Sequence, residues 1–184
     1  MSHHAHILKE FDVLGVWENQ GATQKRKILK LLKNLMKNRY ESEWKKQIQT
    51  SSKLKTYASF KLKFQCEDYL TKSKFSIRRN FTRLRLSAHI LQFEVGRHKK
   101  IPPEKRFCKF CPNIVEDELH FILQCDKYNT IREPFLRNLV EFQNLPVNSQ
   151  FLALMKYDFN SLKLSGLLKF INDCFEIRSG VIDT

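Results

Sequence analysis

The chain has 184 residues, of which 33 are Lys or Arg and 19 are Asp or Glu, so its formal net charge is +14. A charge of this sign and size favours a polyanionic partner, with RNA or DNA expected first and an anionic membrane surface second. Five Gly and five Pro residues are too few for a turn-rich β-sandwich, and no apolar run approaches the ~20 residues of a membrane span. We therefore expect an intracellular, mainly α-helical protein of the nucleus or the cytoplasm.

The N-terminal half divides into a segment over residues 1–22 and a basic helical region over 23–100. The first is mixed in composition and holds two of the five glycines, so we expect it to be weakly structured. The second begins with a helical pattern over 23–48, whose basic residues lie apart from its apolar ones. A helix like that of residues 23–40 can bind nucleic acid, an anionic membrane surface or a calmodulin-like groove. The solvated face of a core helix has the same pattern.

Two further helices are expected in this region. The first covers about 55–70 and should bury the apolar side chains of Tyr57, Phe60, Phe64 and Leu70. The second covers 75–96, ends at a capping Gly96 and has apolar stripes on two opposed faces, so it should be central. A polar strip between the stripes either reaches a groove or makes internal salt bridges, and it consists of Arg78, Thr82, Arg85 and His89.

Residues 101–128 contain the most informative pattern of the chain. Four residues follow the spacing C-x2-C-x8-H-x4-C, and they are Cys108, Cys111, His120 and Cys125. Three thiolates and one imidazole are the ligand set of a closed tetrahedral zinc site, so we predict one structural Zn²⁺ ion in this segment. The alternative is a group of buried apolar cysteines beside a capping histidine.

The last two ligands set a geometric condition on the segment. We expect a short helix over 116–124, with its acidic residues near the positive N-terminal end. His120 and Cys125 are five residues apart, which is about 140° around an ideal α-helix. They can therefore share a metal only if the helix ends or unwinds near Leu123.

Basic and aromatic residues around this segment are candidate nucleic-acid contacts. Lysine and arginine would bind phosphates, and a protruding phenylalanine ring would stack on an unpaired base. The alternative for the two rings is packing of the small finger onto the helical body. The candidates are Arg78, Arg85, Lys99, Lys100, Lys105, Arg106, Phe107, Lys109 and Phe110.

Residues 129–184 should form one or two C-terminal helices, the first near 128–139 and the second over 162–178. Pro134 should mark a helix start or a kink, because proline interrupts the backbone hydrogen bonds of a helix. The two remaining cysteines, Cys66 and Cys174, lie in apolar contexts and should be core residues. The expected fold is thus mainly α, a helical bundle with a small CCHC zinc-binding insert.

Several short sequences around the ligands occur in the same order in one protein family. With them, over about residues 40–178, the chain resembles the C-terminal region of the reverse transcriptases of LINE-like (non-LTR) retrotransposons. The resemblance implies that the four residues match the zinc ligands of that family and that the segment binds template RNA or target DNA. The sequences are SKLKTY at 52–57, RLSAH at 85–89, EVGR at 94–97, IP at 101–102, RFC at 106–108, EDELHF at 116–121, CDKY at 125–128 and CFEIR at 174–178.

The same resemblance implies a piece of a larger enzyme, without its chemistry. The sequence holds neither the aromatic-Ala-Asp-Asp signature of the polymerase nor an endonuclease segment, so we expect a non-catalytic module from a truncated, relic copy. The expected function is a zinc-binding module that contacts RNA or single-stranded DNA. The alternative is a zinc-stabilised structural or protein-interaction domain without a nucleic-acid role.

Overall fold

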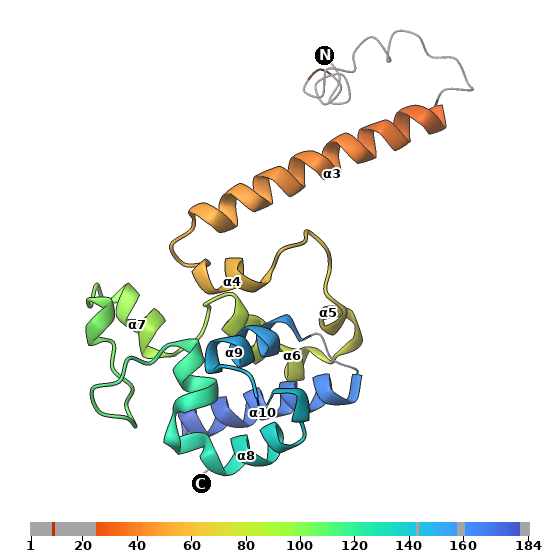
Figure 1. Ribbon diagram of the computed structural model, residues 1–184. Coiled ribbons are helices and arrows are strands. Elements are labelled where there is room, and N and C mark those ends of the chain that lie inside the picture. Colours follow the sequence, from red (N-terminus) through yellow and green to blue (C-terminus); the bar gives the residue numbers. More distant parts are fainter. Residues whose placement is uncertain (1–8, 10–24, 143, 158–160, 181–184) are drawn as a thin grey trace. The chain divides into compact units, whose positions relative to one another are not determined.

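The computed structural model describes residue 9 and residues 25–142, 144–157 and 161–180. These residues form helices, turns and one isolated β-bridge, between Phe107 and Val115, which confirms the predicted mainly α fold with a small Cys/His insert. The segment predicted to be weakly structured, 1–22, lies outside the described residues apart from Lys9. The chain divides into two compact units, Met1–Thr50 and Ser51–Thr184 (Figure 1).

The described part of the first unit is essentially one long helix, α3 (Lys25–Thr50). It confirms the helix predicted over 23–48 and extends it to Thr50, because strong helix formers fill it and neither Gly nor Pro interrupts it. A surface ion pair of 3.1 Å joins Glu41 to Lys45 one turn later. None of the helices in the described ranges combines the length and the apolar character that crossing a membrane requires.

The second unit is built around its C-terminal helix, α10 (Ser161–Ser179), which packs against α6 (Phe75–Arg85) and α8 (Asn129–Arg137) (Figure 1). Leu167, Ile171 and Cys174 of α10 are wholly buried. The other helices of the unit are α4 (Lys55–Phe60), α5 (Asp68–Lys72), α7 (Gln92–His98) and α9 (Val147–Lys156). The short 3-10 segments are η1 (Pro103–Lys105), η3 (Asp126–Tyr128) and η4 (Val140–Phe142), and η2 (His120–Gln124) is a π-helical turn.

The single helix predicted over 55–70 is wrong, because α4 and α5 are separated by an irregular segment. Lys61, which follows α4, has extended backbone angles (φ −93°, ψ 94°). Its amine is buried and lies 2.7 Å from Glu67 Oε1, so a buried ion pair fixes the segment in place of helical hydrogen bonds. Phe64 and Cys66 are exposed, contrary to the prediction that they face the core.

The helix predicted over 75–96 is also interrupted, between α6 and α7. Ser87 has φ +47°, in the left-handed region that residues other than glycine seldom adopt. The Ala88 amide donates to the Arg83 carbonyl at 2.7 Å and closes the end of α6. Gly96 lies inside α7 instead of capping its end. Each of the two predicted apolar stripes is therefore divided by this interruption and does not run along a single helix.

The C-terminal helices agree with the prediction in part. The helix predicted over 162–178 is confirmed as α10, and Cys174 is buried as expected. Pro134 lies inside α8 and does not start it. The helix α9 was not predicted, although Phe151, Leu154 and Met155 have helical spacing and are buried against the core.

Candidate metal centre

Cys108 and Cys111 lie on a tight turn that follows η1. The Cys108 amide donates to the Ile114 carbonyl at 2.7 Å, so the chain folds back on itself around the turn. The Phe110 amide points at Cys108 Sγ, with a nitrogen–sulfur distance of 3.4 Å. Asn113 takes a left-handed conformation (φ 60°), which asparagine tolerates better than most residues and which completes the turn. The predicted tight turn of these two cysteines is therefore present.

The π-helical turn η2 satisfies the geometric condition on His120 and Cys125. Asp117 caps the helical residues that lead into η2, because Oδ1 accepts a hydrogen bond from the His120 amide at 2.7 Å. At its end the Cys125 amide donates to the His120 carbonyl at 2.8 Å, an i→i+5 bond of the π type. A turn that closes on the fifth residue brings both side chains to the same side of the helix. The predicted unwinding near Leu123 thus takes the form of a widened turn that ends at Gln124.

The four predicted ligands converge on one point. Their donor atoms all lie within 4.8 Å of one another. Cys125 Sγ lies 3.9 Å from Cys108 Sγ and 3.5 Å from Cys111 Sγ. A tetrahedral site with Zn–S bonds of ~2.3 Å holds its sulfur atoms about 3.8 Å apart, so this spacing is typical of a metal site. All four residues are buried, the most accessible of them only 6% exposed.

The buried ring nitrogens of His120 and the buried thiols are also consistent with a bound cation. Both ring nitrogens of His120 are buried, and neither has a hydrogen-bond partner in the described part of the chain. Such an unpaired group costs about 1–3 kcal/mol, and coordination of a metal by one nitrogen would remove that cost for it. Burial lowers the pKa of His120 and raises the pKa of the Cys108 and Cys125 thiols. The imidazole is therefore neutral, as a ligand must be, and a cation would supply the charge that the thiols need to ionise.

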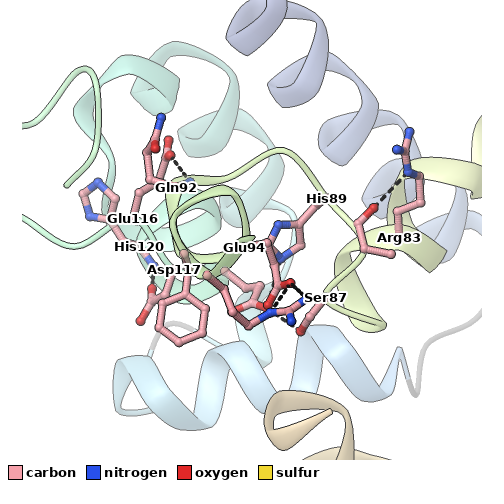
Figure 2. Close-up of polar contacts among 12 residues, drawn as sticks. Arg83, Ser87, His89, Gln92, Glu94, Glu116, Asp117 and His120 are labelled. Carbon is pink, nitrogen blue, oxygen red and sulfur yellow. Dashed lines mark hydrogen bonds and ion pairs between the residues drawn. The ribbon is translucent and has the colours of Figure 1, made fainter. Parts of the chain in front are cut away.

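Glu116 attaches the segment that contains the Cys/His cluster (residues 101–128, the metal segment) to the helical body. Its Oε2 atom accepts hydrogen bonds from Arg178 Nη2 of α10 and from the Gln92 amide of α7, both at 2.7 Å. Figure 2 shows Glu116 beside Gln92, with the dashed line between them. Glu116 Oε1 also lies 3.7 Å from Cys108 Sγ. One carboxylate thus joins a ligand, α7 and α10.

Glu118 makes a second attachment, to the segment that lies between α6 and α7. Its Oε1 atom accepts from Ser87 Oγ at 2.9 Å and lies 3.0 Å from His89 Nε2. Both Glu116 and Glu118 are almost wholly buried. Of the acidic residues 116–118, only Asp117 therefore has the helix N-terminal role expected from the sequence.

Two of the predicted nucleic-acid contacts are buried and require correction. Arg85 is 2% exposed and its guanidinium forms a two-point ion pair with Glu67. Arg106 is 9% exposed and donates to the carbonyls of Ile101 and Phe93, both at 2.9 Å. Because both guanidinium groups already have buried partners, neither is available to a phosphate.

Three other candidates make contacts within the protein, and of these Arg78 and Phe110 are half-buried while Lys109 is exposed. Arg78 Nη1 donates to the Ser73 carbonyl at 3.0 Å. Lys109 Nζ donates to the Arg178 carbonyl at 2.6 Å and lies 4.8 Å from the centre of the Phe110 ring. Phe110 also packs edge-on against Tyr128, with ring centres 6.2 Å apart. Of the two rings considered for base stacking, Phe110 therefore packs onto the body.

The remaining candidates are exposed on one closed turn, which we call the lysine loop (Lys99, Lys100, Lys105 and Phe107). The turn leaves α7 and returns to it, because the Ile101 amide donates to the Gly96 carbonyl at 2.8 Å and η1 packs against α7. Phe107 is 42% exposed and directly precedes the ligand Cys108. Three lysines and one aromatic ring thus lie on the accessible surface beside the metal segment.

Sequence reasoning missed a second group of cations on α6. Arg79 and Arg83 are exposed, and together with His89 they line a cavity. Their spacing of four residues, which places both on one side of a helix, was the available signal. The prediction instead selected Arg78 and Arg85, of which the second faces the core.

No protein-family model, no curated protein and no solved structure matches this chain. The resemblance to the LINE-like reverse transcriptases therefore stays a prediction from the sequence. The features of the chain that bear on its function are the convergent Cys/His cluster and the exposed cations near it.

Proposed function

We propose that this protein is a non-catalytic nucleic-acid-binding module whose Cys/His cluster holds one structural zinc ion. The observation that carries the proposal is the convergence of four buried donors, Cys108, Cys111, His120 and Cys125, directly beside the exposed lysine loop. Sulfur and imidazole donors in a tetrahedral arrangement are the ligands that zinc prefers. Four protein ligands leave no open position for a substrate or a reactive water, which supports a structural role for the metal.

The lysine loop is the surface that we assign to the nucleic acid. Lys99, Lys100 and Lys105 would neutralise phosphates, and the ring of Phe107 would stack on an unpaired base. From residue 97 to residue 107, Glu104 is the sole acidic residue. Single-stranded RNA or DNA is the partner that fits an exposed ring among lysines, since bases in a duplex are already stacked. The sequence resemblance to the LINE-like reverse transcriptases points to the same class of partner.

A structural or protein-interaction role is the second candidate, and one observation favours it. Several charged side chains of the metal segment have partners within the protein. Glu116 pairs with Arg178, Glu118 contacts His89, and Lys109 binds a backbone carbonyl. A finger bound to its own body in this way needs no external partner to be ordered. The two candidates differ in whether the exposed lysines bind phosphates.

The metal is tested first. Protein purified without added chelator should contain one zinc ion per chain by elemental analysis, and Cys111→Ser should lower both the zinc content and the melting temperature. Cys66→Ser is the matched control, because Cys66 is exposed and lies outside the cluster. Zinc content that is zero in the unmodified protein, or equal in the two variants, would contradict the assignment.

The nucleic acid is tested by fluorescence anisotropy with single-stranded RNA and DNA over a salt series. The logarithm of the binding constant should fall with the logarithm of the salt concentration, with a slope of about −0.7 per phosphate contact. The triple variant K99Q/K100Q/K105Q removes up to three such contacts and should therefore reduce the magnitude of the slope by about 2. The control K55Q/K63Q/K156Q removes the same charge at exposed positions outside the lysine loop and should bind nearly as the unmodified protein does. A flat salt response, or equal losses in both triple variants, would favour the structural role.

A further inference from the structure

The cavity lined by Arg79, Arg83 and His89 lies where α6, α10 and the segment between α6 and α7 meet. Its volume is about 250 Å³. Arg79 and Arg83 come to it from α6, His89 from the segment that follows, and Phe175 and Glu176 from α10. Ligand sites for drug-sized molecules measure roughly 300–1,000 Å³, so this cavity suits a smaller group. We call it the α6–α10 pocket.

The two arginines give the pocket an excess of positive charge. They are one helical turn apart on α6 and both exposed, so their like charges repel each other across the same face. Within the described ranges, neither is within ion-pair distance of a carboxylate. Arg83 Nε donates to the Ala88 carbonyl at 3.0 Å, as Figure 2 shows for the labelled arginine. The backbone contact fixes the side chain and leaves its two terminal nitrogens for an anion.

His89 adds a buried group that lacks a partner. Its side chain is fully buried, and Nε2 lies 3.0 Å from the Glu118 carboxylate, which also accepts from Ser87 Oγ. Figure 2 shows His89 above Ser87 at the start of the segment that leads to α7. A carboxylate only accepts, so Nε2 carries a proton toward Glu118, and Nδ1 is the ring nitrogen that is left for a ligand. Nδ1 is buried, and no hydrogen-bond partner for it lies among the described residues.

These groups together define the chemistry of a ligand. Two guanidinium groups suit a phosphate, which they bind through paired hydrogen bonds. Nδ1 suits a hydroxyl group, which can both donate and accept a hydrogen bond. A phosphate next to a hydroxyl group recurs along RNA, whose 2′-hydroxyl DNA lacks. The apolar wall of Ile90 and Phe175 can receive the carbon face of a sugar, and the small volume excludes more than one such unit.

We propose that the α6–α10 pocket binds one ribose–phosphate unit of single-stranded RNA, with the phosphate on Arg79 and Arg83 and the 2′-hydroxyl on His89. This rests on the proposed nucleic-acid function and adds a preference for RNA over DNA. The pocket contacts the backbone of the strand, so the preference does not depend on base sequence. Glu176 lines the same pocket and lowers its affinity for the phosphate.

The test uses the full chain with zinc and two fluorescent 12-nucleotide probes, oligo(U) RNA and oligo(dU) DNA, which differ only in the 2′-hydroxyl. The unmodified protein should bind oligo(U) several-fold more tightly than oligo(dU). R79Q/R83Q should weaken oligo(U) binding about tenfold, lower the salt slope by about 1.4, and bring the two affinities together. The control R137Q/K156Q removes two exposed cations from α8 and α9 and should keep the RNA preference. E176Q should strengthen RNA binding two- to threefold.

His89→Asn should remove the RNA preference with a smaller loss of overall affinity, and if this variant does not fold, the arginine pair decides. Equal affinities of the unmodified protein for the two probes would overturn the proposed role of the pocket. An unchanged ratio of RNA affinity to DNA affinity in R79Q/R83Q would do the same. If binding to both probes depends on the lysine loop while R79Q/R83Q behaves as its control, only the pocket fails. If neither probe binds at 50 mM salt, the nucleic-acid function itself fails.

Discussion

Arg85 makes an unusually large number of contacts inside the protein. Its guanidinium bonds to both carboxylate oxygens of Glu67, on the loop between α4 and α5. It also lies 4.7–5.3 Å from the centres of four aromatic rings, those of Phe60, Tyr69, Phe81 and Tyr157. A buried cation is tolerated only when paired in this way, so carboxylate and rings together replace the water that Arg85 loses. The pair joins α6 to a loop that the sequence pattern assigned to a helix.

The pH dependence of stability should report on this pair. Burial tends to raise the pKa of Glu67, but the hydrogen bonds and charges of Arg85 and Lys61 outweigh it and lower the pKa below its usual 4.5. A lowered pKa contributes stability above pH 4.5, and this contribution is lost as the pH falls through the pKa of the folded state. Glu67→Gln should therefore cost about 1–3 kcal/mol in the free energy of unfolding at pH 7. The difference from the unmodified protein should shrink below pH 4.5.

Urea unfolding between pH 3 and pH 7 measures this difference directly. Glu133→Gln is the control, since Glu133 is exposed on α8, and its curve should follow that of the unmodified protein. A cost of Glu67→Gln that stays constant down to pH 3 would show that the carboxylate charge is not what stabilises Arg85.

Which residues could be predicted from the sequence depends on the range of the interaction that decides them. The convergence of Cys108, Cys111, His120 and Cys125 could be predicted because the spacing typical of a metal site lies within one short segment. Arg85 was misassigned, because its partner Glu67 is 18 residues away and in a different element. Periodicity places Arg85 beside the apolar side of α6, but no local signal says whether a cation there faces water or a buried carboxylate.

At the scale of elements, the same distinction explains the interruption between α6 and α7. The apolar spacing over 75–96 fits one helix, yet Ser87 leaves the helical region with φ +47°. A left-handed serine costs about 1 kcal/mol or more, and tertiary contacts offset this. Ser87 and His89 both bond to Glu118 of the metal segment, which is about 30 residues further along the chain. Sequence patterns predict a helix well where strong helix formers continue without Gly or Pro, as in α3.

Gly96 tests how closely α7 and the metal segment are packed. A Cβ atom at this position would lie 2.6 Å from Arg106 Cγ, and the Arg106 side chain is held by two backbone carbonyls. Gly96→Ala should therefore lower the free energy of unfolding by about 1–3 kcal/mol, despite the better helix propensity of alanine. The matched change is Gly166→Ala in α10, where the nearest atom lies at an ordinary 3.9 Å.

Gly166→Ala should raise the free energy of unfolding by roughly 0.5–1 kcal/mol, because it gains helix propensity without a clash. Thermal or urea unfolding of both variants gives the comparison. Stabilisation of the protein by both changes would mean that Arg106 moves away at little cost. It would also mean that the lysine loop is not fixed by its contact with α7.

At the scale of the whole molecule, the metal segment is part of the core of the second unit. Phe121 of the π-turn and Tyr128 of η3 belong to the same buried cluster as residues of α10. The Phe121 ring lies 4.8 Å from that of Phe175, and Glu116 pairs with Arg178. Arg132 of α8 donates to the carbonyl of the ligand Cys125. The segment thus shares its buried side chains with the helical body and has no separate core.

Removal of the proposed zinc ion should therefore destabilise the whole second unit. Without a cation, buried thiols and an unpartnered imidazole remain in the core, and the loss spreads through Phe121 and Glu116 to α10. We expect a strong chelator to lower the melting temperature of a single cooperative transition, and zinc to restore it. Hydrogen exchange should accelerate in α6 and α10 as well as in residues 106–125. Acceleration confined to 106–125, with α10 unchanged, would mean that the segment unfolds alone and that its contacts with α10 contribute little to the stability of the body.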